Sequence, residues 1–282
     1  MYVATVGLSS CGGCHNALFT IGEPLIALLC DHNIAFSTYM VDHRSISPVD
    51  VVLIEGGIRN REELEVAGEI ARNVRKVIAV GSCAVFGGVN GLRKLEVVPV
   101  VDEGGDLPPL LEEMKPLDSC MSVELYVPGC PPPPNLILEA LKSVLDGYSP
   151  AHFDGSVCSE CPRRAERKSI RSWSQHPGPG VPHEMCLLNK SLLCLGPVTR
   201  GGCHSPCPTR GAVCIGCRGP SDVVQSSQLH SMFGDMVKYV SLTTRAKEDK
   251  VGMQLMSMLR SIYLFTGSDP VTRAKVGEKT GG

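Results

Sequence analysis

Twelve of the fourteen cysteines fall into three groups of four, and this distribution constrains the fold more than any other feature of the sequence. The first group is spread through the first half of the chain: Cys11, Cys14, Cys83 and Cys130. The second group combines a C-x-x-C pair with two later cysteines: Cys158, Cys161, Cys186 and Cys194. The third group joins two closely spaced pairs: Cys203, Cys207, Cys214 and Cys217. Because four thiolates are the ligand set of a cubane iron–sulfur cluster, each group suits one [4Fe-4S] cluster.

Cysteines in such numbers form either disulfides or metal sites, and the sequence favours metal. Disulfides are typical of exported chains, but the first residues show no basic segment, twin arginine or apolar signal stretch. No apolar run approaches the roughly 20 residues needed to span a bilayer. We therefore expect a cytoplasmic protein without membrane insertion. Its net charge of -2 gives no indication of a nucleic-acid partner.

Short apolar runs alternate with helical patterns through the first half of the chain. We expect strands at residues 3–7, 34–41, 50–55, 76–81 and 123–127, and helices at residues 17–30, 61–75 and 133–145. This alternation predicts an α/β fold with a flavodoxin-like, doubly wound parallel sheet. The first cysteine group follows predicted strands, at the edge where open α/β sheets bind ligands, so we expect its members to converge in space.

The composition changes near residue 150, and this change predicts the domain organisation. Residues 1–150 would form the flavodoxin-like domain, and residues 151–224 an irregular, cysteine-rich iron–sulfur domain with the second and third groups. This second stretch has few apolar runs, so we expect the clusters to form its core and metal binding to be coupled to folding. Residues 225–282 are expected to hold a helix near residues 251–264 and a partner-bound tail.

Some residues have alternative interpretations. Zinc is an alternative for the second and third groups, because Cys₄ zinc sites use similar pairs. Cys30 and Cys120 belong to no group and are expected to be ordinary core or surface thiols. His15 could tune a cluster by a hydrogen bond or be a solvated loop histidine. His204 could be an alternative ligand, although four cysteines already complete its group. The charged run 163–168 is expected to be a solvated face, with docking of a partner as the alternative.

These motifs resemble the small, electron-transferring subunit of [NiFe] hydrogenases, over roughly residues 3–220. In that family a C-x-x-C after the first strand, a G-S-C-A segment and a P-G-C-P-P segment bind the proximal [4Fe-4S] cluster beside the nickel–iron site. The resemblance assigns these roles to Cys11, Cys14, Cys83 and Cys130. The segment around Glu55 is similar to the family's V-E-G turn near the same cluster. Glu55, with His15, is therefore a candidate to contact the cluster's ligands.

The resemblance also assigns the other two groups. Segments C-P-R-R and C-L-G-P are similar to the family's distal-cluster segments, which implies a distal [4Fe-4S] cluster on the second group. Cys158 stands where many members have histidine. The third group would hold the medial cluster, where exported members often have a three-iron cluster and a proline in place of one ligand. Four cysteines here imply a full [4Fe-4S] cluster, which normally has a lower reduction potential than a three-iron cluster at this site.

The missing export signals and the phrases G-P-V-T and C-R-G-P are most similar to the cytoplasmic group of these enzymes, in particular the methyl-viologen-reducing type of methanogens. That resemblance implies transfer of electrons from H₂ to heterodisulfide reductase through a small [2Fe-2S] subunit. The NADP-linked sulfhydrogenases are the close alternative. The nickel–iron site is expected in a partner large subunit, so this chain would not cleave H₂ alone. Alternatives from other classes are a structural zinc-binding scaffold and a cluster subunit of a quinone-linked complex.

Overall fold

The computed structural model describes residues 1–40, 49–89, 91, 107–147, 155–166, 184–221, 237–238, 241–242 and 247–249. The chain divides near Ala151 into two compact units. The predicted helix at residues 251–264 and the tail that follows it lie outside the described residues. The predicted domain boundaries stay a prediction.

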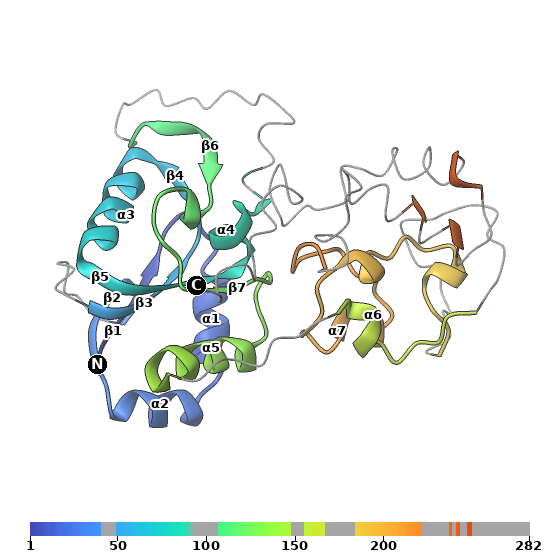
Figure 1. The fold of residues 1–282 in the computed structure, drawn as a ribbon, viewed down its shortest axis with the longest axis horizontal. Helices are drawn as coiled ribbons and strands as arrows, with labels where there is room; N and C mark the ends of the chain where they lie inside the picture. Colours follow the sequence, from blue (N-terminus) through green and yellow to red (C-terminus); the bar gives the residue numbers. More distant parts are fainter. Residues whose placement is uncertain are drawn as a thin grey trace. The chain divides into compact units, whose positions relative to one another are not determined.

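The first unit is built on a five-stranded parallel sheet in the order β2-β1-β3-β5-β7 (Figure 1). The strands are β1 (Tyr2–Gly7), β2 (Asn33–Ser37), β3 (Val49–Glu55), β5 (Val74–Val80) and β7 (Leu125–Val127). Counted along this sheet alone, the order is second, first, third, fourth and fifth, which is the flavodoxin-like arrangement. The predicted α/β fold class is therefore confirmed.

Helices cover both faces of this sheet because side chains alternate between the faces along each strand. They are α1 (Gly13–Phe19), α2 (Glu23–Cys30), α3 (Arg61–Asn73), α4 (Gly81–Phe86) and α5 (Pro134–Asp146). Val52 and Ile54 of β3 pack in one core with residues of α3 and α4. Val51 and Leu53 of the same strand pack in a second core with residues of α1, α2 and α5. The central strand is thus buried on both faces, as parallel sheets require.

Several elements differ from the expectation. The helix predicted at residues 17–30 is two helices, because Gly22 lies between them with φ 69° and ψ -134°, a conformation that favours glycine, and Pro24 then starts α2. The strand predicted at residues 34–41 ends at Ser37 in the described residues. Helix α4 is not among the predicted elements. Nor is the antiparallel pair of β4 (Ile58–Asn60) and β6 (Leu110–Lys115).

The second unit has short elements only within the described residues. They are α6 (Val157–Glu160), α7 (Pro206–Thr209) and the 3₁₀ turns η3 (Leu188–Lys190) and η4 (Gly196–Val198). Isolated bridges such as Ser156 with Arg200 and Thr199 with Pro220 join them. Among the described helices of the chain, none is long and apolar enough by itself to cross a membrane; α1 and α2 pass that test only as a pair, which is bent by 82°.

Candidate metal centres

The first cysteine group lies at the carboxyl ends of the parallel strands. Cys11 and Cys14 follow β1, Cys83 lies in α4 after β5, and Cys130 follows β7. Burial, then the charges of Glu55, Cys83 and Cys130, raise the pKa of the Cys14 thiol. Burial and the nearby Cys11 thiol likewise raise the pKa of Cys83 to about 11. The structure thus brings these four predicted ligands close enough together for their charges to interact.

Backbone hydrogen bonds hold the segments of this group together. The N–H of Ser82 donates to the carbonyl of Gly129 (2.8 Å), and the N–H of Gly129 donates to the Ser82 hydroxyl (3.2 Å). These two bonds join the segment that carries Cys83 to the segment that carries Cys130. The loop after β1 is tied to β3 by the N–H of Leu8, which donates to the Glu55 carbonyl (2.9 Å). Segments far apart in the sequence are therefore fixed side by side.

Two glycines let the backbone lie close to sulfur atoms of this group. A Cβ atom at Gly81 would overlap Sγ of Cys14, and one at Gly88 would overlap Sγ of Cys83. Both glycines have positive φ, 89° and 59° respectively, which any other residue adopts with strain. The backbone therefore lies close to the two thiols, and such close backbone approach to sulfur is typical of iron–sulfur sites.

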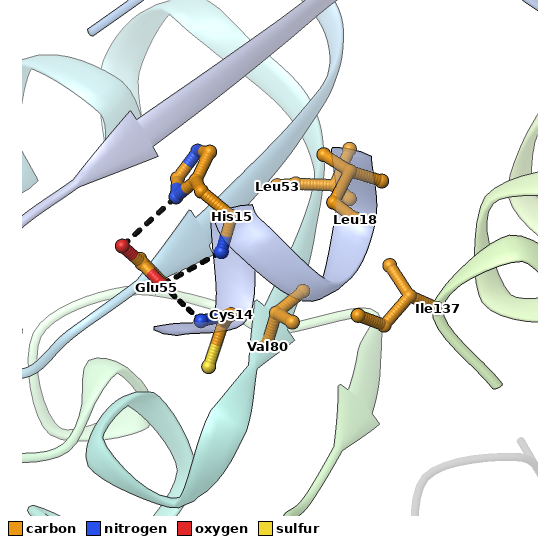
Figure 2. Close-up of a pocket in the computed structure, with 7 residues that line it drawn as sticks. All are labelled: Cys14, His15, Leu18, Leu53, Glu55, Val80 and Ile137. Carbon is orange, nitrogen blue, oxygen red and sulfur yellow. Dashed lines mark hydrogen bonds and ion pairs between the residues drawn. The ribbon is translucent and has the colours of Figure 1, made fainter. Parts of the chain in front are cut away.

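The carboxylate of Glu55 is the centre of a buried hydrogen-bond network next to this group (Figure 2). Glu55 ends β3 and is 2% exposed. Its Oε2 accepts the N–H groups of Cys14 (2.9 Å) and His15 (3.0 Å). Its Oε1 accepts the hydroxyls of Ser10 and Tyr39, both at 3.1 Å, and lies 3.0 Å from Nδ1 of His15. The carboxylate therefore positions the loop that carries Cys11 and Cys14.

This network keeps Glu55 negatively charged. Burial alone would raise the pKa of the carboxyl, but the hydrogen bonds and charge of His15, together with the Ser10 hydroxyl, lower the pKa to about 2. A small pocket lies beside Glu55, and the apolar side chains of its lining are Leu18, Leu53, Val80 and Ile137 (Figure 2). A fixed negative charge in such an apolar setting acts strongly on neighbouring groups.

The second cysteine group is brought together in the second unit. Burial and the charges of Cys194, Cys186 and Cys161, in that order, raise the pKa of the Cys158 thiol to about 12. The backbone supports this convergence, because the N–H of Cys186 donates to the carbonyl of Arg164 (2.9 Å), three residues after Cys161. All four predicted ligands of this group therefore interact.

Glycine and a backbone amide also serve the second group. A Cβ at Gly196 would lie 3.2 Å from Sγ of Cys158 and 3.6 Å from Sγ of Cys194. The N–H of Cys214 donates to Sγ of Cys194 (3.2 Å), the kind of bond that stabilises a thiolate ligand. The second and third groups therefore meet at Cys194 and Cys214.

The third group is only partly assembled. Burial raises the pKa of the Cys203 thiol. The nearby charge of Arg218 lowers this pKa, and the charges of Glu160 and Cys217 raise it. The pKa of Cys214 is raised by burial and by Cys194, with a smaller effect of Cys217. Cys207 lies exposed on α7, and in the described residues its side chain makes no interaction with the other three. Its place in the group stays a prediction.

In the charged run 163–168, which is described as far as Glu166, Arg164 and Glu166 are exposed as expected of a solvated face, and only Arg163 departs from the expectation. Arg163 is only 7% exposed, and its guanidinium donates to the carbonyls of Pro208 and Met185.

The side chain of His204 is 77% exposed, and its backbone N–H donates to Glu160 (3.0 Å). Cys30 is exposed, whereas Cys120 packs against the core of the first unit.

All fourteen cysteines are described, and all are free thiols. Within the described residues, no three His, Cys, Asp or Glu side chains meet the spacing needed to hold one metal ion. A cubane has a different requirement, since each of its four thiolates binds a separate corner.

Comparisons with known proteins identify the family. Residues 11–144 match the family described as NADH ubiquinone oxidoreductase, 20 Kd subunit. A further match is the vhu F420-non-reducing hydrogenase of Methanocaldococcus jannaschii. This chain is 35% identical to its G chain over 237 residues, across 78% of this chain and 82% of that one. The chain belongs to the hydrogenase small-subunit family. It is therefore a subunit of an oxidoreductase.

Other relatives agree with this membership. The G chain of the F420-non-reducing hydrogenase of Methanothermobacter thermautotrophicus is 31% identical over 94% of this chain and 93% of its own. The delta chain of sulfhydrogenase 2 of Pyrococcus furiosus is 32% identical over 78% of this chain and 87% of its own. The solved [NiFeSe] hydrogenase from Desulfovibrio vulgaris Hildenborough shares the fold, with a TM-score of 0.53 at 18% identity over 78% of this chain and 93% of that one. Hydrogenase small subunits carry iron–sulfur clusters, and the glycine-lined thiol groups of this member fit them.

Sequence reasoning missed several residues of these sites. Tyr39 falls in a predicted strand, and no local pattern indicates that its hydroxyl reaches Glu55. Ser10 stands beside Cys11, and that proximity is a signal that could have drawn attention to it. Arg218 lies in the C-R-G-P phrase and Arg200 directly follows G-P-V-T, but neither phrase indicates that these two arginines are buried.

Proposed function

We propose that this chain is the electron-relay subunit of a [NiFe] hydrogenase and carries electrons from a partner large subunit to an acceptor. The observation that carries the proposal is the convergence of separate cysteine groups in a member of the hydrogenase small-subunit family. In this proposal three [4Fe-4S] clusters are held by Cys11, Cys14, Cys83 and Cys130; by Cys158, Cys161, Cys186 and Cys194; and by Cys203, Cys207, Cys214 and Cys217.

The clusters would supply one-electron redox chemistry, and the chain determines how they can be used. Glu55 holds the Cys11–Cys14 loop in place through the N–H groups of Cys14 and His15. Gly81 and Gly88 let the backbone lie close to the thiols of Cys14 and Cys83. The N–H of Cys214 donates to Cys194 and brings the second and third groups into contact. Spacing, burial and hydrogen bonds to sulfur are therefore the contributions of this subunit.

The partners follow from the same proposal. H₂ is cleaved at a nickel–iron site in a large subunit, and this chain does not cleave it alone. The relatives named F420-non-reducing hydrogenase support an acceptor other than F420; we propose a small [2Fe-2S] subunit linked to heterodisulfide reductase, in a cytoplasmic complex. The Pyrococcus furiosus relative, named a sulfhydrogenase subunit, supports the NADP-linked type as the second candidate.

Co-expression with the large subunit tests this function. We expect the chain alone to be insoluble or poor in clusters, and the large subunit to restore a brown complex with H₂-dependent dye reduction. An obligate interface of this kind typically buries upwards of roughly 2,000 Å². A Cys83→Ser variant should lose the activity of the complex, whereas Cys30→Ser, which changes an exposed cysteine outside the three groups, should keep it.

Two results would contradict the proposal. A fully loaded monomer that reduces dye with H₂ on its own would show that this chain is not a relay subunit. A colourless, zinc-containing protein would support the structural scaffold instead.

A further inference from the structure

Two buried arginines stand out in the second unit. Arg200 is 4% exposed and Arg218 is 6% exposed. Guanidinium groups stay charged at neutral pH, and burial of a charge is costly unless an opposite charge lies nearby. The backbone fixes both residues, since the N–H of Arg200 donates to the Gly219 carbonyl (3.0 Å) and Nε of Arg218 donates to the Gly201 carbonyl (2.8 Å).

The groups that face Arg218 belong mostly to the third cysteine group. Burial lowers the pKa of Arg218, whereas the thiols of Cys203 and Cys217 and the carboxylate of Glu160 raise it, and Arg200 adds a like charge. The Glu160 side chain is 8% exposed, and its Oε2 accepts the N–H of His204. Two buried positive charges thus share the neighbourhood of one carboxylate and two cysteines. An anionic, thiolate-bound cluster held by Cys203 and Cys217 would interact favourably with these guanidinium groups.

The first cysteine group has the opposite environment. The buried Glu55 carboxylate accepts the N–H of the ligand Cys14 (2.9 Å), and Nδ1 of the buried His15 lies 3.0 Å from the same carboxylate. Adding an electron makes a cluster more negative. A neighbouring carboxylate therefore opposes reduction, and a neighbouring guanidinium favours it, both more strongly in an apolar interior than in water.

We propose that Arg218, supported by Arg200, is a positioning residue that raises the reduction potential of the third-group cluster above that of the first-group cluster. This inference rests on the proposed relay function. Its consequence is directional: electrons that enter beside Glu55 move towards the higher potential beside Arg218.

The test uses the anaerobically purified complex with its large subunit. Redox titration followed by electron paramagnetic resonance gives the potential of the third-group cluster, identified as the signal lost in Cys217→Ser. Arg218→Gln should make reduction about tenfold less favourable, which corresponds to about 59 mV for one electron. Arg218→Lys keeps the charge and should stay within about twofold of the parent protein. Arg210→Gln removes an exposed arginine and should change nothing, because solvent and salt screen that charge.

Each outcome decides the proposal. If Arg218→Gln keeps its full iron content and the reduction potential of its third-group cluster equals that of the parent protein, the proposal is overturned. If Arg218→Gln fails to assemble the cluster, assembly in Arg218→Lys with parental potential supports the charge effect, whereas failure of both variants shows a purely structural role and overturns it. Absence of iron from the third group in the parent protein is a separate result, since it contradicts the proposed function itself.

Discussion

The first cysteine group is held by a packed sheet, whereas the second and third groups are held by turns and very short helices. Strands β1, β3 and β5 bury apolar side chains on both faces, and the cysteines of the first group extend from this framework. In the described part of the second unit, isolated bridges and single helical turns take the place of a sheet. The comparison indicates that the first site is shaped by the core of the sheet, and we expect the other two sites to depend on metal binding for their stability.

The electrostatic environments of the two units differ in the same way. Next to the first group, the Glu55 carboxylate is buried together with His15, whereas two guanidinium groups, of Arg200 and Arg218, are buried near one carboxylate, of Glu160, next to the third group. The first site therefore combines a packed sheet with a buried carboxylate, and the third combines short elements with an excess of buried guanidinium groups.

The largest expected effect is that of metal removal. Hydrogen exchange followed by mass spectrometry on the loaded and iron-depleted complex should show the second unit losing protection at residues 184–221. Strands β3 and β5 should keep their protection, because their burial does not involve the cysteines. Equal protection of residues 184–221 with and without iron would break the comparison.

A smaller effect is expected from filling the space beside one thiol. Gly81→Ala should remove the first-group cluster, because the added Cβ overlaps Sγ of Cys14 and the φ of 89° strains alanine. Iron analysis should then show a loss of about four irons per chain. The matched control is Gly68→Ala in α3, whose Cβ would meet only the Arg72 side chain at 3.5 Å. That variant should keep all its iron and be stabilised by roughly 0.5–1 kcal/mol.

The smallest effect sharpens the electrostatic contrast. Glu55→Gln removes the negative charge and replaces one acceptor oxygen by an amide donor. The free energy of unfolding should therefore fall by about 1–3 kcal/mol. The potential of the first-group cluster should rise, opposite to the fall expected for Arg218→Gln. Glu65→Gln on the exposed face of α3 is the control and should leave the potential unchanged. Shifts of the same sign in both variants would show that the two sites are not electrostatically different.

Much of the fold was predictable because strand patterns and turn signals are local. The strands after which Cys11, Cys83 and Cys130 lie were found within a few residues of their bounds, and the sheet edge then placed those cysteines together. The break at Gly22 also had a local signal, a glycine followed by Pro24, which the helical periodicity outweighed.

The remaining features depend on contacts between distant segments. The Tyr39 hydroxyl reaches Glu55 only because β2 and β3 flank β1 in the sheet. Burial of Arg163 depends on carbonyl groups at Met185 and Pro208, which no spacing rule connects to it. Pairing of β4 with β6 likewise joins segments about fifty residues apart, and β-propensity alone does not specify such a pairing.

Iron and acid-labile sulfide content of the anaerobically purified complex tests the central claim most directly. Three [4Fe-4S] clusters predict about twelve irons and about twelve sulfides for each copy of this chain, after the nickel–iron site of the large subunit is subtracted. A count of about eleven irons would indicate a three-iron cluster in the third group and would remove Cys207 from its ligands. About four irons, with zinc in place of the remainder, would contradict the three-cluster relay.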